Sequence, residues 1–486
     1  MSNGDRHVVI GAGPAGLTAA WELTRRGCDV MVLEADDTYV GGLSRTQVYR
    51  GNRFDLGGHR FYTKSPRIAE LWRELLPDDL LQVPRISRIH YRGSYFPYPI
   101  DLGITLRRLG LRSSAAVSAS YLRAIARPRR PEASFEDWIV NRFGRRLFDT
   151  FFKTYTEKVW GMPCSEISKD WAAQRIRGLS FSSAVREVIG HRRDDDGPKT
   201  LISSFTYPRL GPGQLWEQVR DAVLANGGEV VHGTRVVRLH RGPTGVTEVE
   251  THDGNRYPAD HVYSTMPLRD LAGVLEPSAP ATVREAGTAL GFRDFLTVAV
   301  VVDHPAVFPD TWIYVHDPNV SVARIQNYRN WSADMVQDPT TTCLGMEYFC
   351  NRGDDLWEMD DSDLLRLAAS ELDALGLVDA ERCIDGQVIR VPDAYPVYDH
   401  DYERHRLTIR RWLDESVPNL HPIGRGGLHN YNSQDHAMMT ALLAVENVLD
   451  GADHDPWAVN TEEEYAETSS GRPGAGARLV PQRLMR

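Results

Sequence analysis

The feature that most constrains the fold is a glycine-rich run near the start of the chain, HVVIGAGPAGLTAAWELTRRGCDVMVLEA, at residues 7–35. A short strand-like stretch precedes three glycines at GxGxxG spacing, a helix with apolar periodicity follows, and a second strand-like stretch ends at Glu34. The glycine pattern alone is weak, but its place between a strand and a helix, with an acid at the expected interval, is typical of a dinucleotide site. The sequence therefore predicts a Rossmann-type α/β domain.

Each residue of this motif has a physical role. Gly11 makes the tight turn, Gly13 admits a pyrophosphate, and Gly16 lets the helix pack on the strand. The N-terminus of the helix favours the negative charge. Glu34 can accept hydrogen bonds from ribose hydroxyls and would repel a 2′-phosphate. We expect these four residues to contact the cofactor.

The stretch VGGLSRT, residues 40–46, bears on which dinucleotide binds. Its Gly41, Gly42 and Arg45 resemble the segment by which the amine oxidase superfamily of flavoproteins continues along its cofactor. The resemblance implies FAD as the cofactor, with Gly42 and Arg45 beside it.

The whole chain sets further bounds. Its 486 residues predict at least two domains, and its formal net charge of -10 argues against nucleic acid as a partner. Five cysteines without a CxxC pair indicate neither a zinc site nor a disulfide framework. No stretch approaches the ~20 apolar residues of a membrane span, and no positively charged start leads into an apolar run. These observations favour the cytoplasm.

The later patterns predict a discontinuous FAD domain. Strand-like stretches return from residue 227 to residue 264, and in the resembling flavoproteins a valine there, here Val236 or Val237, presents its backbone to the adenine. Strand-like runs at 295–303 and 343–349 suggest an antiparallel sheet in a second domain with helices, which would cover the substrate. We expect an FAD domain at 1–95, 200–290 and 395–460, a substrate domain at 96–199 and 291–394, and a flexible tail at 461–486.

An arginine-rich segment with helical periodicity, at about 101–190, has two interpretations. Its arginines between 107 and 130 form either a solvated helix face, which we favour, or a surface for a membrane or another anionic partner.

Four motifs narrow the family. They are FDLGGHRFYTK at 54–64, YTEKVWGMPCSEISKDWAAQRIRGLS at 155–180, TWIYVHDPNVSVARIQNYRNWS at 311–332 and IGRGGLHNYNSQDHAMMTALLAVENVL at 423–449. In this order they resemble the UDP-galactopyranose mutases, which are relatives of the amine oxidases and the protoporphyrinogen oxidases. The resemblance runs from Val8 to about Leu449 at the level of motifs.

The resemblance implies positions for several residues. Gly57, Gly58 and His59 would lie against the isoalloxazine ring, since paired glycines allow close approach to a flat group. Arg324 and Arg425 would hold the diphosphate of a sugar nucleotide, a task that suits the guanidinium fork. Further residues that the resemblance places near flavin or substrate are Asp435, Tyr431, Arg175 and Trp160.

Other interpretations stay open for these residues. His59 can be a structural histidine, and Arg324 can form an ion pair with a carboxylate. Arg425 can face the flavin, Asp435 can be a simple helix N-terminal acid, and Trp160 can be a core residue. The fourth motif is about two residues shorter between Arg425 and Asp435 than in the mutases. No stretch matches the one that grips the base, so guanine, thymidine or lipid-linked sugars stay candidates.

The resemblance implies a flavoenzyme that interconverts pyranose and furanose forms of a nucleotide-linked sugar, through an adduct of the sugar with N5 of reduced flavin. His59, Arg324 and Arg425 would be the catalytic residues, and a reductant would prime the flavin. The alternative is an FAD-dependent oxidoreductase of the amine oxidase or protoporphyrinogen oxidase type. A scaffold stabilised by FAD is a third, less favoured, interpretation. No metal cluster is expected, and a homo-oligomer stays open.

Overall fold

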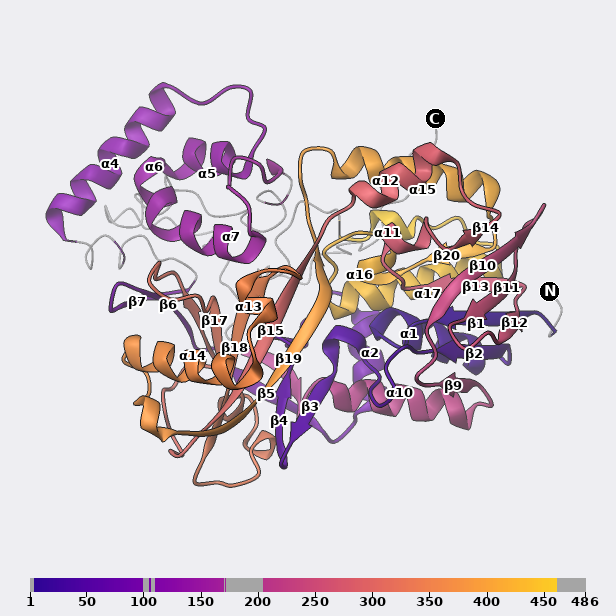
Figure 1. Cartoon of the computed structure of the whole chain (residues 1–486), viewed down its shortest axis with the longest axis horizontal. Helices are drawn as coiled ribbons and strands as arrows, with labels where there is room; N and C mark the ends of the chain where they lie inside the picture. Colours follow the sequence, from indigo (N-terminus) through magenta and orange to yellow (C-terminus); the bar gives the residue numbers. More distant parts are fainter. Residues whose placement is uncertain (1–3, 99–104, 106–109, 170, 172–203, 461–486) are drawn as a thin grey trace.

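The computed structural model describes residues 4–98, 105, 110–169, 171 and 204–460. Arg175 and the tail at 461–486 lie outside these residues. The chain forms two lobes, the first built on a five-stranded parallel sheet with the order β20-β13-β1-β2-β9 (Figure 1). Its strands are β1 (Arg6–Ile10), β2 (Asp29–Leu33), β9 (Glu229–Val231), β13 (His261–Ser264) and β20 (Leu420–Pro422). The predicted Rossmann-type unit is confirmed.

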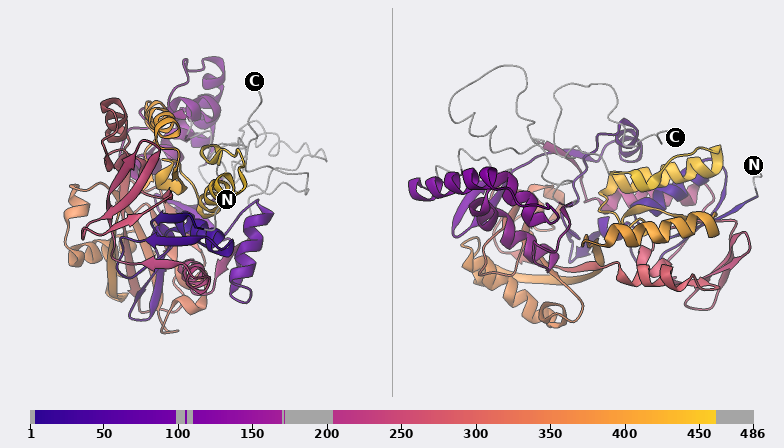
Figure 2. Two further views of the ribbon diagram at one scale, coloured as in Figure 1. Left: turned by 90° about the vertical axis from the view of Figure 1, so that its right-hand side faces the viewer. Right: turned by 90° about the horizontal axis from the view of Figure 1, so that it is seen from above.

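Helices cover one face of this parallel sheet. They are α1 (Pro14–Arg25), α2 (Pro66–Leu75), α10 (Gly213–Ala225) and α17 (Gln434–Asp450). Alternate strand residues such as Val9 and Val32 are buried against α1, α10 and α17. Figure 2 shows α17, in yellow, beside the indigo α1.

The other face of the parallel sheet packs on a second layer. Here Val8, Ile10 and Val262 meet a four-stranded sheet and three helices. The strands of this layer are β10 (Val236–Gly242), β11 (Gly245–Thr251), β12 (Arg256–Pro258) and β14 (Leu275–Glu276), and its helices are α11 (Leu268–Leu271), α12 (Ala281–Ala289) and α15 (Tyr402–Ser416). The parallel sheet is therefore buried on both faces, as parallel sheets generally are.

Three neighbouring strands of the parallel sheet carry a row of histidines. His7 stacks on His261 at a ring-centroid distance of 5.3 Å, and His261 stacks on His421 at 5.6 Å. Burial, together with the nearby His261, lowers the pKa of His7 to about 4. Burial likewise lowers the pKa of His421 to about 3. All three rings are therefore neutral at physiological pH.

The second lobe contains a seven-stranded sheet with the order β19-β15-β18-β17-β16-β6-β7. Adjacent strands are antiparallel, except that β16 and β6 pair in parallel. The strands are β6 (Ser87–Tyr91), β7 (Ser94–Pro97), β15 (Phe292–Val302), β16 (Trp312–Val315), β17 (Arg324–Asn327), β18 (Thr342–Cys350) and β19 (Cys383–Pro396). The expected mainly antiparallel sheet is present, and β15 and β19 extend from it toward the first lobe (Figure 1).

Helices flank this sheet on both sides. The helix α14 (Asp361–Ala374) packs on one face, while aromatic side chains of the other face meet a group of helices between residues 111 and 160. These are α4 (Leu111–Ala126), α5 (Phe135–Phe143), α6 (Arg145–Leu147), a π-helix (Phe148–Phe152) and α7 (Lys153–Trp160). The short helix α13 (Asp355–Glu358) follows β18.

Two small sheets complete the fold. One is the hairpin of β3 (Thr46–Tyr49) and β4 (Asn52–Asp55), and the other pairs β5 (Leu80–Pro84) with β8 (Ser204–Pro208). Because β6 and β7 pair within the seven-stranded sheet, we propose that the first domain boundary lies between β5 and β6, not at residue 95. Within the described ranges, no helix combines the length and the apolar character needed to cross a membrane.

Candidate functional site

The glycine-rich turn after β1 leaves no room for larger residues. Gly11 has a φ of +92°, and a Cβ there would lie 2.1 Å from Oγ1 of Thr265. A Cβ on Gly16 would lie 1.9 Å from the carbonyl oxygen of Gly11. The two glycines therefore set the tight turn and the close approach of α1 to β1, as the motif predicts.

The N-terminus of α1 is open toward an anion. Its N-cap, Gly13, offers no side chain, Pro14 occupies the first turn, and that turn contains no acid. The Gly41 amide donates to the carbonyl of Ala12 at 2.8 Å, and this brings Gly42 against Gly13. A Cβ on Gly42 would lie 3.3 Å from Cα of Gly13. These residues form a bare backbone cradle, which suits a pyrophosphate.

Glu34 lies at the end of β2, beside this cradle. Its carboxylate accepts hydrogen bonds from the amides of Ala12, at 2.5 Å, and Asp36, at 2.8 Å. Its carbonyl accepts from the amide of Thr234 at 2.7 Å, two residues before Val236. Val236, the first residue of β10, is buried. The cradle, Glu34 and Val236 therefore occupy neighbouring segments, which is the order that an extended dinucleotide requires.

Arg45 does not point freely into this cradle. Its Nη1 donates to the Asp36 carboxylate at 2.5 Å, and its guanidinium lies over the ring of Tyr39. The visible role of Arg45 is to fix the segment after β2, and a contact with the cofactor stays a proposal.

The segment Gly57–His59 lies between the lobes. Gly57 has a φ of +109°, and a Cβ there would lie 3.6 Å from Oε1 of Glu347. A Cβ on Gly58 would lie 3.5 Å from Nε2 of Gln326. The backbone of this segment thus runs close to the polar face of the seven-stranded sheet. Burial, followed by the positive charges of Arg425 and Arg324, lowers the pKa of His59 to about 3, so its imidazole is neutral.

A buried ion pair holds Arg324 on that sheet face. Arg324 and Glu347 are register partners on β17 and β18. Nε and Nη2 of Arg324 donate to Oε2 of Glu347 at 2.9 and 2.5 Å, and Gln326 donates to Oε1. Glu347 is fully buried, whereas the Arg324 side chain is 19% exposed. Arg324 therefore forms the ion pair that was its alternative interpretation, and its side chain stays partly exposed.

Arg425 approaches from the first lobe. It lies on α16 (Gly424–Gly427), donates from Nε to the carbonyl of Asn432 at 2.9 Å and from Nη1 to that of Ala394 at 3.3 Å. Its guanidinium lies over the rings of Tyr431 and Tyr395, at 4.9 and 5.5 Å. Among the described residues it has no ion pair with a carboxylate. The charges of Arg425 and Arg324 both lie near enough to His59 to lower the pKa of its imidazole.

Aromatic residues line the space around the two arginines. Tyr395 and Tyr431 stack at 5.5 Å with an interplanar angle of 21°. Tyr314, the register partner of Arg324, contacts Tyr98 at 4.5 Å and Tyr155 at 5.6 Å. Trp160 is buried against Trp171, which in turn contacts Tyr431. Trp160 therefore has the core position that its alternative interpretation gave it.

The N-terminus of α17 reaches the same place. The side chain of Gln434, the first residue of this helix, accepts from Nε1 of Trp216 at 3.2 Å and donates to the carbonyl of His59 at 3.5 Å. Asp435 is buried and accepts from Oγ of Ser433 at 2.5 Å. The structure thus brings His59, Arg324, Arg425, Tyr431 and the N-terminus of α17 with Asp435 to one region between the two lobes, which we call the cleft.

Sequence reasoning missed several residues of this cleft. Glu347 carries the ion pair of Arg324, Gln434 links α17 to His59, and Tyr395 lies under Arg425. The sequence could have indicated Glu347, because it is a single acid inside the apolar run CLGMEYF. No local pattern indicates Tyr395, since its position follows from the long strand β19.

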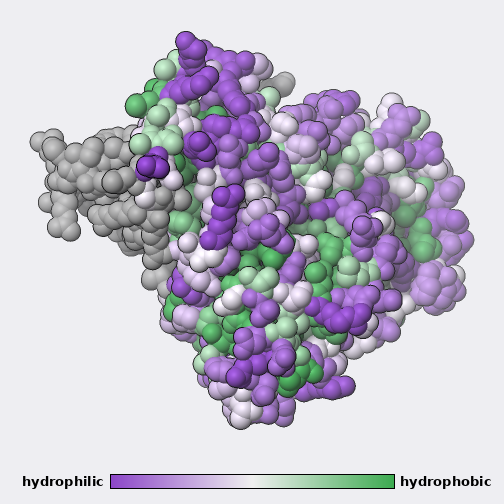
Figure 3. Space-filling view, turned by 60° about the vertical axis from the view of Figure 1, so that its left-hand side comes forward, coloured by the Kyte–Doolittle hydropathy of each residue, from purple (hydrophilic) through white to green (hydrophobic). Residues whose placement is uncertain are grey.

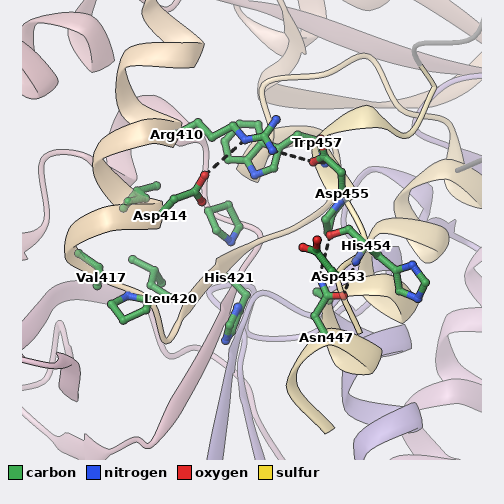
Figure 4. Close-up of a pocket in the computed structure, with 15 residues that line it drawn as sticks. Arg410, Asp414, Val417, Leu420, His421, Asn447, Asp453, His454, Asp455 and Trp457 are labelled. Atoms are coloured by element: carbon green, nitrogen blue, oxygen red, sulfur yellow. Dashed lines mark hydrogen bonds and ion pairs between the residues drawn. The ribbon is translucent and has the colours of Figure 1, made fainter. Parts of the chain in front are cut away.

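A separate cavity of about 320 Å³ lies between α15, β20 and the C-terminal end of α17 (Figure 4). Arg410 there pairs with Asp414 and Asp455, and His454 pairs with Glu446. None of the predicted site residues lines this cavity. Its charges are largely paired internally, and we assign it no ligand.

Comparison with known proteins places this geometry in a family. The family model described as flavin containing amine oxidoreductase matches residues 14–449. Coproporphyrinogen III oxidase of Propionibacterium freudenreichii is 26% identical over 63% of this chain and 65% of its own length. A probable UDP-galactopyranose mutase of Klebsiella pneumoniae is 27% identical over 43% of this chain and 64% of its own length. These matches span less than two thirds of either relative.

Solved structures share the fold. The crystal structure of reduced UDP-galactopyranose mutase superimposes with a TM-score of 0.82 at 22% identity and covers 95% of this chain and 100% of its own. A putative protoporphyrinogen oxidase from Exiguobacterium sp. 255-15 gives a TM-score of 0.72 at 18% identity, over 93% and 100%. The bare cradle at Gly13 and Gly42 fits the cofactor of such proteins. The chain belongs to the family of flavin-containing amine oxidoreductases, it is a flavoenzyme, and its cofactor is FAD.

Proposed function

We propose that this flavoenzyme acts on a nucleotide diphosphate sugar and interconverts its pyranose and furanose forms. The observation that carries the proposal is that each lobe contributes one guanidinium, Arg425 over the ring of Tyr395 and Arg324 on β17, and both lie near enough to His59 for their charges to lower its pKa. Two guanidiniums that approach from opposite walls suit a diphosphate, which offers each of them a pair of oxygens.

The balance of charge supports an anionic substrate. Glu347 neutralises Arg324, but Arg425 has no carboxylate partner among the described residues and bonds only to carbonyl groups. A positively charged amine would be repelled by this excess charge. Tyr395 and Tyr431 also stack at a distance of direct ring contact, 5.5 Å, so an amine cannot lie between them.

The residues of the cleft have distinct roles in this proposal. Arg425 and the open edge of Arg324 hold the diphosphate and stabilise its charge when the sugar bond breaks. Glu347 fixes the orientation of Arg324, and neutral His59, held by Gly57 and Gly58, packs beside the cofactor without adding charge. Tyr155 and Tyr314 line the space that the sugar would occupy. Reduced FAD supplies the nucleophilic centre in such enzymes.

The second candidate is an oxidoreductase that acts on a flat ring system. The observation in its favour is the aromatic lining of the cleft, in which Tyr314 contacts both Tyr98 and Tyr155. The oxidase relative and the mutase relative have nearly the same identity to this chain, 26% and 27%, so the relatives support both candidates equally.

The experiment is a titration of the purified protein with UDP, GDP and dTDP, read from the flavin spectrum in the oxidised and chemically reduced states. Arg425→Ala should weaken the binding by about 1.5–3 kcal/mol, the range for a hydrogen bond to a charged group. We expect the same loss of binding in the double variant Arg324→Met with Glu347→Met. Both partners are replaced there so that no buried acid is left unpaired.

Arg220→Ala, at an exposed ion pair on α10, is the matched control and should bind as the unchanged protein does. Retained flavin in every variant shows that the cofactor site is intact. Unchanged nucleotide affinity in both site variants contradicts the diphosphate assignment. No spectral response to any nucleotide favours the oxidoreductase, and oxygen consumption with amines and porphyrinogens then becomes the assay.

A further inference from the structure

The helix α4 exposes large hydrophobic side chains at its C-terminal end. Leu122 is 65% exposed and Ile125 is 55% exposed, and they are neighbours on the helix surface because they are three residues apart. The opposite face of α4, with Val117 and Ala124, is buried where the helix packs on α5 and α6. Leu122 and Ile125 are therefore not needed for the packing of α4.

The same segment concentrates positive charge. Residues 102–131 contain seven arginines and no acid, in a chain whose net charge is -10. Four of these arginines are exposed and have no ion pair with any residue that the structure describes: Arg112, Arg123, Arg127 and Arg130. Arg107 and Arg108 lie outside the described residues.

Several arginines close to this segment do have acidic partners. In the neighbouring helices Arg142 pairs with Glu132, and Arg145 pairs with Glu136 and Asp149. Arg129, at the end of the basic segment, pairs with Glu136 and Asp137. A solvated helix face of ordinary composition would carry acids of this kind between its arginines.

Position on the molecule also favours contact with a large partner. Figure 1 shows α4 at the outer edge of the second lobe, away from the parallel sheet. The upper part of the view in Figure 3, to which α4 belongs, combines hydrophilic and hydrophobic surface. An exposed apolar pair with arginines beside it at an outer edge suits contact with a flat surface.

We propose that the C-terminal half of α4, with Leu122, Ile125, Arg123 and Arg127, docks the protein reversibly on an anionic phospholipid surface. The arginines contact the lipid phosphates, and the two aliphatic side chains enter the interface between headgroups and acyl chains. The protein as a whole is anionic, so the arginines of this segment favour an orientation in which α4 faces such a surface. The contact is peripheral and independent of the substrate that the cleft takes.

The test is flotation of the full-length, FAD-loaded protein with two kinds of vesicle. One contains phosphatidylcholine and phosphatidylglycerol, and the other contains phosphatidylcholine alone. We expect binding to the first kind only, which weakens as salt rises. Arg123→Glu with Arg127→Glu should lower the partition coefficient at least tenfold, by removing two favourable charges of about 1 kcal/mol each and adding two repulsive ones.

Separate variants test the aliphatic pair. Leu122→Ser with Ile125→Ser should weaken the binding at least several-fold, whereas the control Ile384→Ser, at an equally exposed side chain elsewhere, should not change it. Arg366→Glu with Arg404→Glu makes the same change of net charge away from α4 and should bind as the unchanged protein does. Flavin content and melting temperature confirm that each variant is folded.

Three outcomes would overturn the proposal. The first is no binding to the anionic vesicles. The second is equal loss of binding in the Arg366 and Arg404 control, which would mean a general charge effect. The third is binding that resists the serine changes at Leu122 and Ile125 while a soluble polyanion such as heparin binds equally well, which would identify a soluble acidic partner.

Discussion

Around Gly13 the protein offers backbone amides, whereas around Arg324 it offers side chains. The cofactor cradle comes from two short segments, residues 11–16 and 41–42, whose lack of side chains creates the space. The opposite wall of the cleft takes Arg324, Glu347 and Tyr314 from three different strands. A group common to a whole family can be held by backbone, while the part of a site that distinguishes substrates needs side chains that can be exchanged.

The largest effect should follow from filling the cradle. A Cβ on Gly13 would lie 3.9 Å from its nearest neighbour, so the Cβ of Gly13→Leu meets no protein atom, while its side chain should fill the place that we propose for the pyrophosphate. We expect purified Gly13→Leu to contain almost no flavin and to unfold at the temperature of the apoprotein. The measurement is the ratio of flavin to protein absorbance, with Gly4→Leu as a control at an open glycine away from the cradle. Full flavin content in Gly13→Leu would place the pyrophosphate elsewhere.

The next effect concerns the side-chain wall. Glu347→Gln leaves the charge of Arg324 buried without its partner, which should lower the free energy of unfolding by about 3–5 kcal/mol. Urea unfolding measures this loss. In Arg324→Met with Glu347→Met both charges are absent, and the loss should be clearly smaller. Equal losses in the single and the double variant would mean that the pair acts only through packing.

The two walls also differ in what a sequence reveals about them. Gly11, Gly13, Gly16 and Glu34 could be predicted because one continuous βαβ segment contains the whole pattern, and local geometry fixes each role. The pairing of Arg324 with Glu347 could not, since it depends on the register of β17 against β18, which only the complete sheet sets.

The same argument bears on the first domain boundary, which we propose to lie between β5 and β6. The strands β6 and β7 follow the FAD-domain segment in the chain, yet β6 pairs in parallel with β16, more than two hundred residues later. No local pattern records a partner so distant. The position of Tyr395 under Arg425 has the same origin, because the path of β19 determines it.

A smaller effect should appear in the free energy of unfolding as the pH rises. Asp55, beside the Gly57 segment, is fully buried, and burial raises its pKa to about 7 although Tyr207 and Thr46 donate hydrogen bonds to it. The unfolded state releases this proton near pH 4, so Asp55 should make the folded state less stable as the pH rises from about 4 to about 7. Urea unfolding across that range should show a shallower decline for Asp55→Asn. An identical pH profile would mean that Asp55 is ionised in the folded protein.

The smallest expected effect is on stability as the pH falls. His7, His261 and His421 are neutral in the folded state, with lowered pKa values, but they bind protons in the unfolded chain below about pH 6.5. Their contribution to stability is therefore present above pH 6.5 and is lost as the pH falls toward 4. His7→Phe should reduce the acid-induced loss, measured by urea unfolding at several pH values. A variant with unchanged acid sensitivity would assign that loss to carboxylates instead.

The long strands β15 and β19 have a consequence for motion. They pair from Phe292 and Pro396 at one end to Val302 and Cys383 at the other, and the carbonyl of Ala394 accepts a hydrogen bond from Arg425 of the first lobe. Opening the lobes like a hinge must therefore bend two hydrogen-bonded strands or break the contact at Ala394. Such a frame should resist changes in the spacing of Arg324 and Arg425. We therefore expect that a ligand of the proposed site enters through movement of loops and side chains at the rim more than through rotation of the lobes.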